Sequence, residues 1–193
     1  MNKKIVVING HPDKESFNFA VANRYKEEAE KSGAEVREII IADLAFNPDL
    51  NFGYRKRTEL EPDLITAWKN IMWADHLVWI HPVWWGGLPA RMKGFIDRVF
   101  LPGVAFSYRT DSIFWDKHLK GKTARIITTL DQPGWIYRLL FGRPSVNQLR
   151  KSTLQFCGIA PVNVTYLAII KTSDAAQRKK WLVKVGKLGQ KQR

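Results

Sequence analysis

The chain has 193 residues, 45% of them apolar, and it carries a formal charge of +13 at pH 7. This length suits one domain with a substantial core and is too short for two ordinary domains. The single cysteine, Cys157, excludes an intramolecular disulfide and a zinc site built from thiolates, and it favours a reducing, cytoplasmic location.

Strands and helices alternate along the predicted structure. Short apolar, β-branched runs predict five strands, at residues 3–9, 36–41, 76–81, 123–129 and 162–169. Apolar residues that recur every three or four positions predict a helix after each strand, at residues 16–31, 62–74, 89–100, 146–157 and from 174 onward. This order indicates an α/β fold in which an open five-stranded parallel sheet carries helices on both faces. We expect residues 1–193 to form a single domain.

The positive charge is concentrated in residues 171–193, which hold eight Lys or Arg and one acidic residue, Asp174. Asp174 can cap a helix, and the basic face of that helix is expected to be solvated, with peripheral contact to an acidic membrane surface as the alternative. A nucleic-acid binder would interleave aromatic and basic residues, but the eight tryptophans are spread over predicted core positions. We therefore expect no nucleic-acid partner. No apolar run approaches the about 18 residues of a membrane span, and residues 5–8 are too short a core for a signal peptide.

A metal site is not expected, because the four histidines, at positions 11, 76, 81 and 118, show no ligand spacing. His76 and His81 are an odd number of residues apart on one strand, so they point to opposite faces of the sheet. Cys157 lies in an apolar segment and is predicted to be a core residue rather than a nucleophile.

Ligands of open parallel sheets bind beyond the carboxyl ends of the strands, where the strand order reverses. This rule selects the loops after the first, third and fourth strands. In the first of these loops, Ser16 can cap the following helix, whose free amides at Phe17, Asn18 and Phe19 could face a phosphate. An ordinary helix capped by Ser16 explains the same residues, and spacing alone does not separate the two.

The other two loops carry aromatic and hydroxyl side chains. Trp84 and Trp85 stand beside two glycines, which suits the face of a flat ligand, although both indoles could instead plug the core. After the fourth strand, residues 128–135 supply hydroxyls and an indole that could close the ligand site, or they form a plain turn.

The chain resembles the flavodoxin-like NAD(P)H:quinone oxidoreductases, a family that includes quinone and nitro-group reductases and ancillary subunits of potassium efflux systems. Residues 81–100, HPVWWGGLPARMKGFIDRVF, are similar to the family's flavin-ring loop and the helix after it. Residues 11–18 resemble its phosphate loop, and residues 105–108, AFSY, resemble an aromatic segment beside its substrate pocket.

The resemblance implies an FMN cofactor, with FAD as the alternative, that accepts hydride from NAD(P)H and passes two electrons by a ping-pong mechanism to a quinone, nitro or azo acceptor. By motif, Phe106 and Tyr108 would line the acceptor site, and Tyr137 is the candidate for proton handling. The resemblance also implies a homodimer. A flavin-binding or NAD(P)H-binding ancillary subunit of a potassium efflux system is the alternative function. The residues expected to bind the cofactor are His11, Ser16, Phe17, Asn18, Pro82, Val83, Trp84, Trp85, Gly86, Thr128, Thr129, Leu130 and Asp131.

The chain departs from the family pattern in two places. Leu130 and Asp131 follow the Thr128-Thr129 pair where family members often have glycines, so the resemblance does not fix the path of the fourth loop. No histidine follows Tyr137, which leaves a proton relay without its second member.

Overall fold

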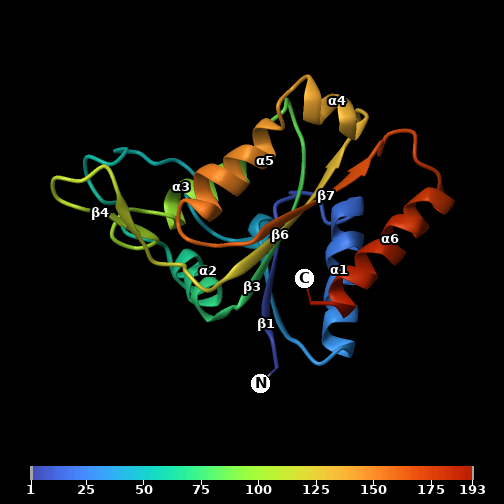
Figure 1. Ribbon diagram of the computed structural model, residues 1–193, viewed down its shortest axis with the longest axis horizontal. Helices are drawn as coiled ribbons and strands as arrows, with labels where there is room; N and C mark the ends of the chain where they lie inside the picture. Colours follow the sequence, from blue (N-terminus) through green and yellow to red (C-terminus); the bar gives the residue numbers. More distant parts are fainter. Residues whose placement is uncertain (1, 193) are drawn as a thin grey trace.

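A five-stranded parallel sheet forms the centre of the computed structural model, which describes residues 2–192 (Figure 1). The strand order is β2-β1-β3-β6-β7, so the chain moves outward from β1 to β2 and then returns past β1 to β3. The predicted α/β fold is confirmed, and the strand order reverses between β1 and β3. The strands are β1 (Lys4–Asn9), β2 (Glu35–Ile40), β3 (His76–Pro82), β6 (Thr123–Leu130) and β7 (Val162–Ala168).

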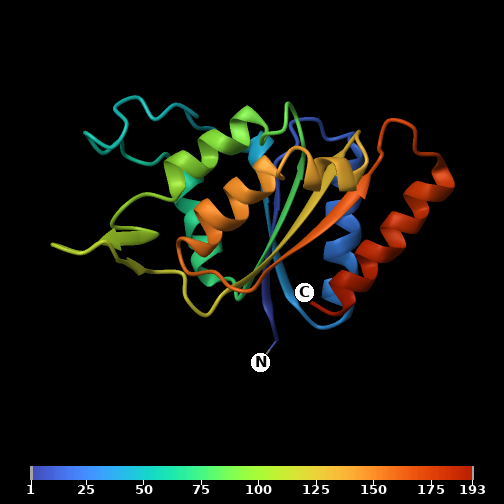
Figure 2. The ribbon, with the colours of Figure 1, turned by 45° about the horizontal axis from the view of Figure 1, so that its top comes forward.

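Helices cover both faces of the sheet (Figures 1 and 2). Side chains alternate between the faces along each strand, so Val6 and Ile8 join one core while Ile5 and Val7 join the other. The first core lies under α2 (Pro62–Trp73), α3 (Ala90–Val99), α5 (Pro144–Leu149) and the π-helical turn at Arg150–Gln155. The second core lies under α1 (Phe17–Lys31) and α6 (Ala175–Gln190).

The basic C-terminal segment is a well-packed helix. Its amino end is capped as expected, with Asp174 Oδ1 accepting from the Gln177 amide at 2.7 Å. Trp181 and Val185 are buried against the sheet. A Cβ at Gly189 would lie 2.4 Å from the Tyr25 carbonyl oxygen, so only glycine lets α6 approach α1 this closely. The apolar stripe of α6 thus belongs to the core, and its lysines lie on the outer side.

Two elements were not predicted from the sequence. An antiparallel hairpin, β4 (Phe106–Tyr108) and β5 (Trp115–Lys117), stands apart from the main sheet, and α4 (Gly134–Leu139) follows β6. Three-residue strands and a six-residue helix are too short for a periodic apolar pattern to develop. The helix expected at 146–157 begins two residues earlier, at Pro144, and continues into the π-helical turn.

The long loop of residues 43–61 is bound by a buried cation from α3, Arg98. Its guanidinium donates to the Asn47 carbonyl, to the Glu59 carbonyl at 2.9 Å and to the Glu61 carboxylate at 2.8 Å. Burial acts to raise the pKa of Glu61, but backbone hydrogen bonds to its carboxylate and the Arg98 guanidinium together keep that pKa below its usual value. The loop therefore has a fixed path over α3 without regular secondary structure.

Candidate functional site

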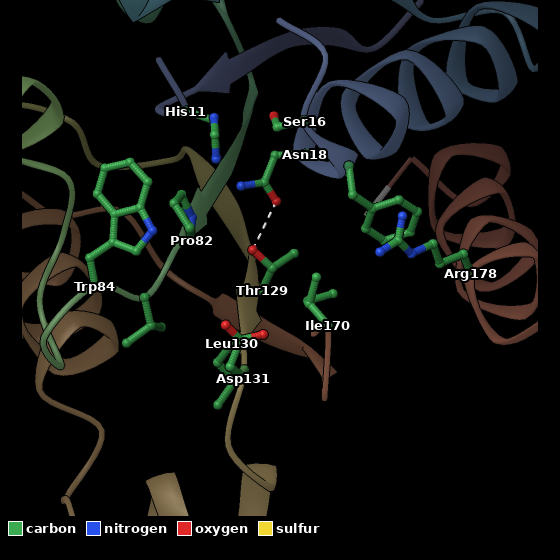
Figure 3. A pocket seen from close by; sticks show the side chains of 12 residues that line it. His11, Ser16, Asn18, Pro82, Trp84, Thr129, Leu130, Asp131, Ile170 and Arg178 are labelled. Atoms are coloured by element: carbon green, nitrogen blue, oxygen red, sulfur yellow. Dashed lines mark hydrogen bonds between the residues drawn. The ribbon is translucent and has the colours of Figure 1, made fainter. Parts of the chain in front are cut away.

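A cavity of about 270 Å³ lies at the carboxyl ends of the central strands, next to the reversal of strand order (Figure 3). Its walls come from the loop after β1 with the start of α1, the loop after β3, the end of β6, and the segment from β7 into α6. Ten of its residues were predicted as cofactor contacts, and Ile170 and Arg178 were not. The lining residues are His11, Ser16, Phe17, Asn18, Pro82, Val83, Trp84, Thr129, Leu130, Asp131, Ile170 and Arg178.

The start of α1 has unused hydrogen-bonding capacity. Ser16 occupies the N-cap position with an extended backbone, but its side chain caps no amide, and its buried Oγ has no partner among residues 2–192. Within the same described residues, no acceptor faces the amides of Phe17 and Asn18. A self-capped helix is therefore not what the structure contains. Free amides, a free hydroxyl and the positive end of a 15-residue helix together suit an anion.

Arg178 adds a positive charge to this end of the cavity. It lies on the first turn of α6, with its Cζ 5.6 Å from the centre of the Phe17 ring and its Nε donating to Ser173 Oγ at 3.0 Å. Sequence reasoning assigned this residue to a solvated tail. The available signal was its position: a helix that begins just after the last strand starts at the carboxyl edge of the sheet, where ligands bind.

Asn18 and His11 supply further donors. Asn18 is buried, and its Oδ1 accepts from Thr129 Oγ1 at 3.0 Å, which leaves the Nδ2 amide free to donate (Figure 3). The Nδ1 of His11 accepts from the Asp13 amide at 3.0 Å. Burial lowers the pKa of His11, so the ring is neutral at pH 7 with its proton on Nε2. Each of these side chains therefore presents an N–H group.

The loop after β3 places one tryptophan at the cavity and the other in solvent. Trp84 is partly exposed, lines the cavity, and meets the His11 ring edge to face at 5.5 Å. Trp85 has a left-handed backbone, with φ at 49°, and its side chain is fully exposed. Neither indole plugs the core. Gly86, also left-handed with φ at 74°, lies outside the cavity lining, as does Trp85, so their contact with a cofactor stays a prediction.

Thr128 and Thr129, at the end of β6, point to opposite faces of the sheet. Thr129 faces α1 and lines the cavity, whereas Thr128 is fully buried and lies outside the lining. Alternation along a strand explains the difference, because neighbouring side chains point to opposite faces of the sheet. Asp131, one of the two departures from the family pattern, accepts from the Lys171 amide at 2.7 Å and so joins the loop after β6 to the loop after β7.

Tyr137 is buried on α4 and lies outside the cavity lining. Its hydroxyl donates to the Gly86 carbonyl at 3.3 Å, shares a 2.7 Å hydrogen bond with Ser145 Oγ, and accepts from the Ser145 amide at 3.1 Å. The observed contacts make it a link between α4 and the loop after β3. A role in proton handling stays a prediction.

Replacing Tyr137 with Phe removes this link while keeping the ring. Because the Gly86 carbonyl and Ser145 Oγ then lose a buried partner, we expect the free energy of unfolding to fall by about 1–3 kcal/mol. Urea denaturation measures this change. Tyr54→Phe, which makes the same change at an exposed tyrosine, is the matched control and should cost little. An unchanged free energy in Tyr137→Phe would show that the three contacts contribute nothing to stability.

Phe106 and Tyr108 lie at a second cavity, of about 280 Å³, on the other face of the sheet. Phe100 and Phe156 line the same cavity. The first and second cavities have no lining residue in common. Within one chain these two predicted acceptor residues are therefore separate from the predicted cofactor residues. Cys157 also borders this second cavity; it is buried, as expected, and burial raises the pKa of its thiol to about 12.

The described part of the chain holds neither a metal-binding cluster nor a membrane-spanning helix. Within residues 2–192, no group of three or more His, Cys, Asp or Glu side chains could hold a metal ion. In the same range, none of the helices combines the length and apolar character needed to cross a membrane.

Comparison with known proteins places the chain in a family. The family described as having the flavodoxin-like fold matches residues 3–187. The chain belongs to this family. A crystal structure of Smu.1420 from Streptococcus mutans is 34% identical, with a TM-score of 0.85 over 97% of this chain and 98% of that one. An NAD(P)H:quinone oxidoreductase from Methanothermobacter marburgensis, 19% identical with a TM-score of 0.82, shares the fold over the full length of both chains.

Two curated relatives carry oxidoreductase names. NAD(P)H dehydrogenase (quinone) 1 of Rattus norvegicus is 27% identical over 181 residues, which span 81% of this chain and 65% of that protein. An uncharacterised NAD(P)H oxidoreductase of Haemophilus influenzae is 28% identical over 179 residues, spanning 90% of this chain and 88% of that protein. The resemblance predicted from the motifs is confirmed. The chain covers less than two thirds of the rat protein's length, so that protein's activity is not transferred with the family.

Proposed function

We propose that this protein is a flavin-dependent NAD(P)H oxidoreductase that holds FMN in the 270 Å³ cavity and reduces quinones or related acceptors by ping-pong hydride transfer. The observation that carries the proposal is the start of α1 beside the cavity, where Ser16 Oγ and two amides have no partner within the described range, residues 2–192. A phosphate would satisfy these groups, and the names of the curated relatives support the redox chemistry.

The residues present suit a flavin. A bound flavin supplies the hydride chemistry itself. In this proposal Ser16, Asn18 and the α1 amides bind the phosphate, and Arg178 adds its charge. Trp84 and Pro82 contact the ring, and the buried floor of the cavity at Leu130 keeps water from that side. The protein thereby binds, orients and shields the cofactor without a nucleophilic side chain.

The choice of FMN rather than FAD rests on the size of the cavity and on Arg178, which stands at its edge. We expect the protein purified without added flavin to be yellow, and the chromophore released on denaturation to have the mass of FMN. NADH and NADPH oxidation with a soluble quinone then measures turnover. A protein that binds neither FMN nor FAD would contradict the proposal, and release of FAD would correct the cofactor alone.

We also propose a cytoplasmic homodimer that uses the β4–β5 hairpin. Tyr108, Ile113 and Phe114 expose large apolar side chains there, which supports contact with another chain. Trp115 contributes less to this surface, because its ring stacks on the Phe156 ring of the same chain, with the ring centres 4.3 Å apart. Sedimentation equilibrium should show a dimer that Ile113→Ser weakens. No observation supports the alternative role as an ancillary subunit of a potassium efflux system.

A further inference from the structure

Four large apolar side chains protrude together from α4 and the two residues after it. Trp135, Leu139, Leu140 and Phe141 are 62%, 76%, 74% and 57% exposed, and we call this group the α4 knob. It stands beyond the carboxyl ends of β6 and β7, at the upper edge of the molecule in Figure 1. Scattered apolar residues are common on protein surfaces, but a contiguous group of this size marks an interaction site.

The inner side of α4 fixes the position of the knob. Tyr137, on the opposite side of α4, is fully buried with Leu130 and Val146 and makes the hydrogen bonds to Gly86 and Ser145 described above. The Arg143 amide also donates to the Tyr137 carbonyl at 3.1 Å, which closes the turn after the knob. The four apolar side chains are therefore presented outward by an anchored helix.

The charges of the segment that carries the knob are of one sign. Residues 132–173 contain no Asp or Glu. Arg138 lies within the segment of the knob and is exposed, and Arg143 lies two residues after the last residue of the knob. A short amphipathic segment that combines Trp, Leu and Phe with arginine is typical of proteins that lie in the interfacial layer of a bilayer, where apolar side chains enter the lipid and cations meet anionic headgroups.

A second copy of the chain is a poorer occupant. A two-fold contact through the knob would bring Arg138 close to its own counterpart with no carboxylate in the segment to offset the repulsion. About a third of the surface of these four side chains is already buried within the chain, so covering the rest would remove on the order of 500 Å² of surface from solvent. A stable interface buries about 800 Å² on each partner. The β4–β5 hairpin cannot extend the patch, since it lies on the far side of the molecule (Figures 1 and 2).

We propose that the α4 knob inserts into the interfacial layer of an anionic lipid bilayer. The contact does not depend on a bound flavin. The hydrogen bond from Tyr137 to Gly86 joins the knob to the loop that carries Trp84. If the proposed function also holds, the bilayer would therefore contact the protein beside the cavity that holds the flavin and reduces apolar quinones.

The test compares binding of three proteins, each saturated with FMN, to vesicles of equal phosphatidylglycerol and phosphatidylcholine at low ionic strength. We expect the unmodified chain to sediment with the vesicles, and the double variant Leu139→Gln, Leu140→Gln to bind at least about tenfold more weakly, because two leucines no longer enter the lipid. The control variant Ile65→Gln, Met72→Gln removes two exposed apolar side chains from α2 and should bind as the unmodified chain does.

Trp135 provides a direct second readout. Brominated phosphatidylcholine in the vesicles should quench part of the tryptophan emission of the unmodified chain, and this part should be absent in Trp135→Phe. Equal binding by the Leu139→Gln, Leu140→Gln variant would overturn the proposal and assign lipid contact to the lysines of α6. Absence of vesicle binding, with a dimer that this variant dissociates, would assign the knob to a second copy. The flavin absorbance of the same samples reports separately on the proposed function.

Discussion

Replacing Asn18 with Asp is expected to weaken FMN binding at least about 100-fold while changing riboflavin binding little. The new carboxylate keeps the acceptor for Thr129 Oγ1 and lies in the first turn of α1, where a negative charge is stabilised by the helix. It would therefore remove the free Nδ2 donor and also repel the phosphate. At about 5 Å and an effective dielectric constant of about 20, each unit of phosphate charge adds roughly 3 kcal/mol of repulsion, which corresponds to a factor of about 100.

Riboflavin separates the phosphate site from the rest of the cavity, because it has the same ring and no phosphate. Flavin fluorescence titration of both ligands measures the two dissociation constants. Asn163→Asp adds the same charge at an exposed position near the amino end of β7 and should leave both constants unchanged. Equal loss of FMN and riboflavin binding in Asn18→Asp would indicate a disturbed cavity, and no loss of either would place the phosphate elsewhere.

The sequence predicted the sheet and the position of the cavity because both follow from local rules. A buried parallel strand is a short β-branched run, and five such runs separated by helices leave few arrangements. Parallel strands end at one edge, so loops that are far apart in the sequence, around His11, Trp84 and Thr129, had to meet there. Ten of the twelve lining residues come from these loops.

The parts that were missed depend on tertiary contacts. Nothing in the basic run distinguishes Arg178 from its neighbours Lys179 and Lys180; only the start of α6 at the sheet edge brings it to the cavity. The separation of Phe106 and Tyr108 from the cavity likewise depends on which face the β4–β5 hairpin covers. For Ser16 the structure decides between two predictions. The residue spacing fitted a self-capped helix and an anion site equally well, and a side chain that caps no amide favours the anion site.

Acidification is expected to destabilise the protein by about 5 kcal/mol between pH 7 and pH 4.5 through two buried histidines, His76 and His81. Burial lowers the pKa of His76 to about 3, helped by the nearby charges of Lys3 and Arg125, and the pKa of His81 to about 4. Both rings are therefore neutral in the folded protein across this range. In the unfolded chain each has a pKa near 6.5, so the unfolded state binds more protons as the pH falls.

The direction of the effect follows from this difference in protonation. Stability is greatest above about pH 6.5 and falls by about 1.4 kcal/mol per pH unit for each histidine, until the pH approaches the pKa of the folded state. The structure explains why neither ring can accept a proton cheaply. His81 Nδ1 donates to the Pro82 carbonyl at 2.9 Å, and no partner among residues 2–192 faces the buried Nε2 of either ring. Because whole domains have about 5–15 kcal/mol of stability, unfolding near pH 4.5 is expected.

Single substitutions should divide the pH dependence between the two sites. Asn in place of His76 or His81 keeps a hydrogen-bonding amide near the Nδ1 position and cannot titrate. Between pH 6 and 4.5, the slope of the unfolding free energy against pH should therefore fall by about half in each variant. His118→Gln, at an exposed histidine bonded to Ser107, should keep the full slope. Guanidinium denaturation at a series of pH values gives these slopes even where a variant is less stable throughout. An unchanged slope in both Asn variants would mean that carboxylates, and not the buried histidines, control acid unfolding.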